Sequence, residues 1–99
     1  MDKYQAIIHD YEIKILSVDK CNRHLVFEPI CRCLLENSDS NIFYSITESD
    51  DELSLVIDKQ VIHYFNYVED IQYSDDTYKV IQIYEKISGR KSILNYIKI

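Results

Sequence analysis

Cysteine and histidine side chains are the residues of this chain that could bind a metal ion or act as nucleophiles. Cys31 and Cys33 are two residues apart, and Cys21 precedes His24 in a Cys-x-x-His spacing. On a helix, residues two apart point about 200° from each other, so Cys31 and Cys33 cannot hold one ion. The Cys-x-x-His pair has no partner pair at zinc-ligand spacing. We therefore predict no catalytic residue, no metal ligand and no cofactor, with at least one of Cys31 and Cys33 buried as a small hydrophobe. The ligand-binding residues stay unassigned.

An acidic run at residues 48–52 could bind calcium, since carboxylate oxygens are the ligands that this ion prefers. Four of its five residues are acids: Glu48, Asp50, Asp51 and Glu52. An EF-hand loop also needs a glycine at its sharp turn and a glutamate at its end, and the run continues into neither. We interpret it as a solvated turn between two strands.

The elements that must position these residues follow from the apolar spacing. Residues 6–8 either form a short strand of their own or begin the first one. The apolar spacing predicts strands over 11–18, 42–47, 53–58 and 78–84, and a helix over 27–37, while 59–67 fits either a helix or a strand. Pro29 is expected in the first turn of the helix, where its missing N–H costs nothing. Strands and helix in this order predict an α+β fold of the ferredoxin-like split βαβ kind, with helices covering one face of an antiparallel sheet.

The apolar face of that helix is expected to carry Phe27, Ile30, Cys31, Leu34 and Leu35. Nine tyrosines lie among acidic rather than basic residues, and packing in the fold or a protein interface would each account for them.

Length and charge exclude several classes of protein. The chain has 99 residues and a formal net charge of −6, with a single glycine. This length suits one domain. A negative chain is a poor ligand for nucleic acid or an anionic membrane, and one glycine cannot build a glycine-rich phosphate loop. The first residues lack the apolar stretch of a secretory signal. Three cysteines are an odd number and do not make the disulfide framework of a secreted protein. We therefore expect a cytoplasmic location.

One stretch resembles a known family. Residues 42–58, IFYSITESDDELSLVID, resemble the hairpin of ACT-like domains, most of all those of the CASTOR family of cytosolic arginine sensors. Residues 11–19 and 25–35 resemble the first strand and first helix of that family, and residues 78–83 resemble the strand that closes its first domain. The resemblance covers roughly residues 5–84.

The resemblance implies an ACT-type βαββαβ sandwich and a function without catalysis. Proteins of that family have four ACT-like domains, dimerise, bind arginine between the second and fourth domains, and hold the GATOR complex to restrain TOR growth signalling. This chain resembles the first domain alone, so no arginine-binding or GATOR-contacting residue is carried over. On this basis residues 1–84 would be a single ACT-like domain and residues 85–99 a basic exit linker or tail.

The expected function is that of a regulatory binding domain of this amino-acid sensor family that acts through dimerisation, as a homo-oligomer or with a related ACT-domain protein. Two alternatives stay open: a stand-alone interaction domain without a small ligand, and an accessory regulatory domain of an amino-acid metabolic enzyme. A small Cys/His enzyme or zinc protein is the poorest of the readings.

Overall fold

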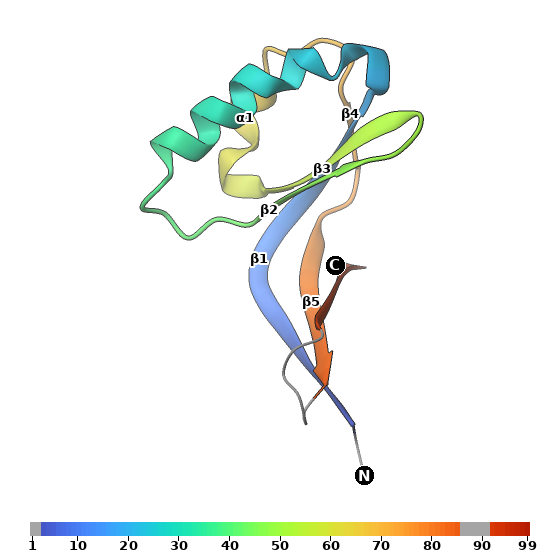
Figure 1. Ribbon diagram of the computed structural model, residues 1–99. Helices are drawn as coiled ribbons and strands as arrows, with labels where there is room; N and C mark the ends of the chain where they lie inside the picture. Colours follow the sequence, from blue (N-terminus) through green and yellow to red (C-terminus); the bar gives the residue numbers. More distant parts are fainter. Residues whose placement is uncertain (1–2, 86–91) are drawn as a thin grey trace.

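The fold is a helix layer packed on one face of an antiparallel sheet, as seen in a computed structural model that describes residues 3–85 and 92–99 (Figure 1). The predicted α+β class with an antiparallel sheet is confirmed. The elements in chain order are β1 (Tyr4–Asp19), η1 (Lys20–Asn22), α1 (His24–Glu36), β2 (Tyr44–Glu48), β3 (Glu52–Asp58), η2 (Lys59–Phe65), β4 (Gln72–Tyr73), β5 (Tyr78–Glu85) and β6 (Ser92–Lys98).

The sheet is organised around the long strand β1. Its strand order is β2-β3-β1-β5-β6, with the short β4 also paired to β1. Residues 13–19 of β1 pair with β3, whereas residues 4–8 and 12–13 pair with β5 on its other side. Residues 4–8 of β1 therefore lie at one end of the sheet with β5, and β3 lies at the other end beside residues 13–19.

The main core lies between the sheet and the two helices α1 and η2. Leu16 and Leu55 face Val26 of α1 and Phe65 of η2, and these four side chains are at most 2% exposed. A smaller cluster around Ile13, Val56 and Val80 packs on the opposite face of the sheet. Burying such side chains supplies the main driving force for folding.

Two expectations for the helix are wrong. It begins at His24 rather than near Phe27, so Pro29 lies inside it and not in its first turn. The buried face carries Val26, Pro29 and Cys33, while Phe27 and Leu35 are 52% and 78% exposed. Because proline has no N–H to donate, its position inside the helix is favourable only where packing outweighs the lost bond, and here Pro29 is buried.

The remaining elements either match those predicted from the sequence or are longer than predicted. The expected hairpin is present as β2 and β3, and residues 6–8 begin β1 rather than forming a strand of their own. The ambiguous segment after β3 is the 3-10 helix η2. Of the expected linker or tail, residues 86–91 lie outside the described part, and residues 92–98 form β6 along β5.

The strands β1, β5 and β6 continue beyond the helix layer as an extension that we call the exposed arm: residues 4–10 of β1 with β5 and β6 (Figure 1). The described chain has a radius of gyration of 15.1 Å and extents of 49 × 32 × 25 Å. A compact domain of about 100 residues has a radius of gyration near 13 Å. The molecule is thus elongated, with the arm along its length.

Candidate functional site: a polar pocket and an exposed arm

The two cysteines at Cys-x-Cys spacing lie on different sides of α1. Cys31 is exposed, and Cys33 is 1% exposed within the main core, so the prediction that at least one is buried is confirmed. Burial raises the pKa of the Cys33 thiol above its ordinary value, and the nearby carboxylates of Glu36 and Asp58 raise it further. A thiol held protonated in this way is a poor nucleophile.

The Cys-x-x-His residues do not form a site in the structure. Cys21 is exposed in η1 and His24 is exposed at the start of α1. His9 lies on the exposed arm, where its Nε2 is 3.0 Å from Gln82 Oε1, and the ring of His63 stacks on Tyr64. Across residues 3–85 and 92–99, no group of three or more His, Cys, Asp or Glu side chains is placed to hold a metal ion.

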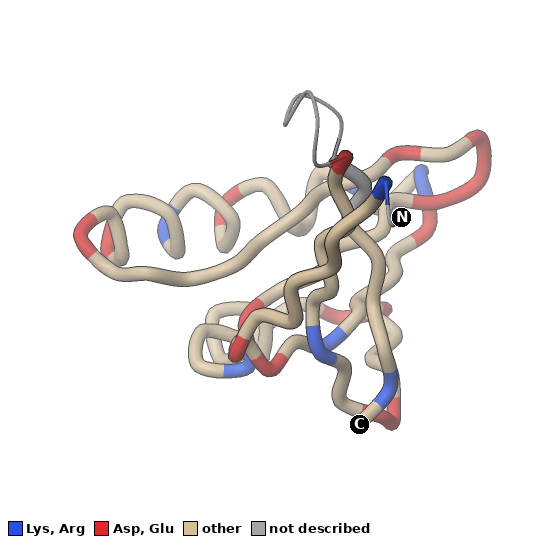
Figure 2. The backbone as a smooth tube through the Cα atoms, turned by 90° about the horizontal axis from the view of Figure 1, so that it is seen from below, with Lys and Arg blue, Asp and Glu red and all other residues tan. Residues whose placement is uncertain are grey.

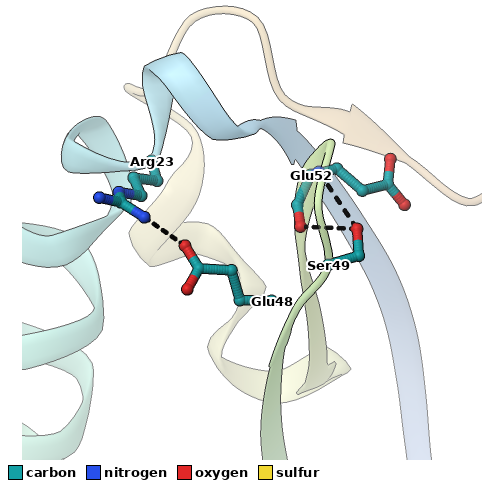
Figure 3. A network of polar contacts seen from close by, with 4 residues as sticks. All are labelled: Arg23, Glu48, Ser49 and Glu52. Atoms are coloured by element: carbon teal, nitrogen blue, oxygen red, sulfur yellow. Dashed lines mark hydrogen bonds and ion pairs between the residues drawn. The ribbon is translucent and has the colours of Figure 1, made fainter.

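The acidic turn between β2 and β3 is tied to its neighbours (Figure 3). Glu48 forms an ion pair with Arg23 before α1, and Ser49 Oγ donates to the carbonyl of Glu52 at 3.1 Å. Ser17 Oγ donates to Glu52 Oε2 at 2.6 Å. These contacts close the hairpin and fasten it to β1 and to the start of α1, which is a structural role.

A polar pocket lies where the exposed arm meets the helix layer. Its volume is about 620 Å³, and it is lined by residues 9–12, Asn41 and residues 58–60. The pairing of β1 with β5 shifts register between Ile8 and Glu12, and this bulge makes residues 9–11 one wall of the pocket. Bulges of this kind re-aim side chains and recur next to functional sites.

The loop before β2 supplies a second wall. Tyr11 Oη donates to Asn41 Oδ1 at 2.7 Å, which holds the bulge against that loop. The Tyr11 ring also packs on Phe43, with centroids 5.7 Å apart, and Phe43 meets Tyr96 of β6 edge-on at 6.3 Å. Tyr11 thus belongs both to the pocket and to an aromatic cluster that reaches β6.

Asp58 is the unusual residue of the pocket. It ends β3 and is 1% exposed. Its Oδ1 accepts from the backbone N–H of Gln60 at 3.0 Å, which caps η2. Its other oxygen, Oδ2, is buried with no hydrogen-bond partner among the described residues. Buried polar atoms without a partner are rare in proteins and costly, more so when charged.

The charges around this pocket are mostly negative. The lining contains three acids, Asp10, Glu12 and Asp58, and one basic residue, Lys59. Its net charge is −2, with His9 counted as neutral. Lys79 lies beside it, with its Nζ 3.4 Å from the backbone carbonyl of Asp10. Along the backbone, Lys and Arg are interspersed with Asp and Glu in the part of the chain described (Figure 2).

The exposed arm is the second feature that could bind a partner. Its exposed apolar side chains include Tyr4 and Ile8 of β1, at 62% each, and Leu94 and Ile97 of β6, at 46% and 44%. The register Ile7↔Gln82↔Leu94 aligns two of its exposed apolar residues across the three strands. Because side chains alternate between faces along a strand, Ile7 and Leu94 lie on one face of the arm and Ile8 and Ile97 on the other.

Sequence reasoning missed both features. The sequence predicts Asp58 as the last residue of a strand, although an acid between an apolar strand and a helical segment is a typical N-cap. The arm is missed because the sequence predicts an exit linker or tail over residues 85–99 in place of a strand.

Comparisons with known proteins add no identity to these observations. A scan against protein-family models matches none, and a search of curated proteins gives no match. Among the helices of the described residues, none has the length and apolar character to cross a membrane.

Proposed function

We propose that this chain is a non-enzymatic, ACT-like regulatory domain that acts by pairing with a second copy of itself. The connectivity supports this proposal. β3 is antiparallel to both β1 and β2, so β1 and β2 are parallel with β3 between them, and α1 connects them. This connectivity supports our interpretation of a split βαβ unit, with β5 on the other side of β1 as in a βαββαβ sheet.

Two differences from that pattern limit what is carried over from it. The second helix is the seven-residue 3-10 helix η2 instead of an α-helix, and β6 adds a further strand. The arginine pocket that the sequence resemblance implies belongs to later domains of that family. The proposal therefore rests on association, and a role in amino-acid sensing and TOR signalling would follow from pairing with a related sensor chain.

The edge of β6 is the observation that carries the proposal. β6 is last in the strand order, so its outer edge is unpaired among the described residues. Natural edge strands are commonly protected by charges, prolines or bulges. The sequence of β6, SILNYIK, has one charge, Lys98 at its end, and no proline. An edge of this kind favours pairing with a second strand.

A two-fold axis at this edge would pair β6 with its own copy. The contact would then be self-complementary, as in most homodimers, and would join two arms into one continuous sheet. Ile97, 44% exposed on β6, would lie at this contact. The β2 edge is the rival surface, with Ile46 as its exposed isoleucine.

Sedimentation velocity across a concentration series tests the proposal, with two matched variants. Ile97 and Ile46 are 44% and 46% exposed, each on a terminal strand of the sheet. We expect a dimer that Ile97→Glu dissociates and Ile46→Glu leaves intact. A strictly monomeric chain, or a dimer that only Ile46→Glu dissociates, would refute pairing through β6.

A further inference from the structure

We propose that Asn95 lies on the two-fold axis of the β6 pair and controls it, by holding a backbone N–H that the second copy needs. This inference rests on the proposed pairing of two copies and adds the register of the pair and its controlling residue. It stands on the hydrogen bonding between β6 and β5, on one side-chain contact at the outer edge of β6, and on the symmetry of the strand.

The pairing with β5 decides which backbone groups of β6 point to its outer edge. The register continued one residue past Lys98 places Ile99 opposite Thr77, and the Ile99 N–H donates to the Thr77 carbonyl at 3.0 Å. Hydrogen-bonded and non-hydrogen-bonded pairs alternate along an antiparallel ladder. The N–H and C=O groups of Lys98, Tyr96 and Leu94 therefore point away from β5, toward the outer edge.

The side chain of Asn95 occupies one of these outward donors. Its Oδ1 accepts from the Tyr96 N–H at 2.8 Å. Asn95 is exposed and is the middle residue of β6. Asparagine side chains compete with sheet ladders for backbone groups in this way. A second strand that pairs along this edge must therefore break the bond, once in each copy.

The strand β6 can pair with its own copy over its whole length when Asn95 lies on the axis. Antiparallel pairing of all seven residues places Asn95 opposite Asn95 and Leu94 opposite Tyr96. Each Tyr96 N–H then donates to the Leu94 carbonyl of the other copy, because both groups point outward. A shift by two residues in either direction moves the axis to Leu94 or Tyr96 and shortens the paired segment.

The side chains also favour this register. Leu94 is 46% exposed and would lie beside Tyr96 of the other copy, whose ring already meets Phe43 edge-on. Cross-strand pairs that include an aromatic ring add to the stability of a sheet. The one charged residue of β6 is Lys98 at its end, so the two lysines would lie at opposite ends of the pair. A second copy thus fits this edge without a like-charge contact.

Disulfide trapping of the whole chain tests the register. Cys21→Ser and Cys31→Ser first remove the two exposed thiols, and the buried Cys33 stays. In this background, Asn95→Cys should give a covalent dimer on mild oxidation. Opposed residues of a non-hydrogen-bonded pair have Cα atoms about 4.5 Å apart, which is within the range of a disulfide.

Two neighbouring positions are the matched controls for trapping. In the proposed register, two copies of Leu94→Cys, or two copies of Tyr96→Cys, are diagonal rather than opposite neighbours. Diagonal neighbours are about 7–8 Å apart, beyond disulfide range. Both variants should therefore give far less covalent dimer than Asn95→Cys.

Sedimentation velocity tests the control that Asn95 exerts. Asn95→Ala removes the bond to the Tyr96 N–H from both copies, so the Kd of the dimer should fall about tenfold. Asn66→Ala makes the same change at an exposed position after η2 and should leave the Kd unchanged.

Two results would overturn the inference and leave the proposed function standing. One is a covalent dimer that forms more readily with Leu94→Cys or Tyr96→Cys than with Asn95→Cys, since it would move the axis. The other is a dimer whose Kd is unchanged or raised by Asn95→Ala. A chain that stays monomeric in every variant would instead refute pairing through β6, and this inference with it.

Discussion

Asp58→Asn is expected to stabilise the protein. Asp58 is 1% exposed and one of its two carboxylate oxygens has no partner among the described residues. A buried polar atom left unpaired costs about 1–3 kcal/mol, and more when it is charged. Asparagine keeps the oxygen that caps η2 and replaces the unpaired charged atom with a neutral amide. The substitution should therefore raise the free energy of unfolding by about 1 kcal/mol.

A second substitution separates the charge from the cap. Asp58→Ala also removes the unpaired charge, but it loses the bond to the Gln60 N–H. Loss of an N-cap costs about 1 kcal/mol. The alanine variant should therefore be about 1 kcal/mol less stable than the asparagine variant and close to the unchanged chain. The order of the three proteins distinguishes the two roles of this side chain.

The assay is urea unfolding at neutral pH followed by circular dichroism. For a domain of this size, 1 kcal/mol corresponds to about 4–8 °C in Tm. Asp50→Asn changes the net charge equally at an exposed position and should stay within about 0.5 kcal/mol of the unchanged chain. If Asp58→Asn instead lowers stability by 1 kcal/mol or more, Oδ2 has a favourable partner and the reasoning fails.

Three further predictions concern the core, the free energy of unfolding at alkaline pH, and the hairpin of β2 and β3. Phe65→Ala, at a side chain with 0% exposure, should cost about 3–5 kcal/mol in urea unfolding, and a loss below 1 kcal/mol would show that η2 is not part of the core. The pKa values of Cys33 and Tyr73 are raised by burial above 9.0 and 10.0, so the folded state holds these protons more tightly. Stability should therefore be full below pH 9 and fall as pH rises through the raised values, and Cys33→Ala should flatten that fall. Arg23→Ala breaks the half-exposed pair with Glu48 and should cost less than about 1 kcal/mol; a larger loss would mean that this pair anchors the hairpin.

The sequence predicts those parts of the fold that depend on local pattern. Apolar residues in 53–58 and 78–84 predict β3 and β5, although β3 is buried on both faces, with Leu55 on one and Val56 on the other. The face of α1 could not be read in this way. Val26, Pro29 and Cys33 share it with partly buried Ile30, and the apolar residues Phe27 and Leu35 remain exposed. Apolar spacing identifies a helix, but tertiary packing decides which face is buried.

The candidate site could not be predicted because it depends on contacts between distant residues. The pocket brings residues 9–12 to Asn41 and to residues 58–60, and the bulge that aims them is a property of the pairing between β1 and β5. The unpaired oxygen of Asp58 is visible only when all its neighbours are placed. Composition indicates that the chain is acidic, but not where a carboxylate is buried.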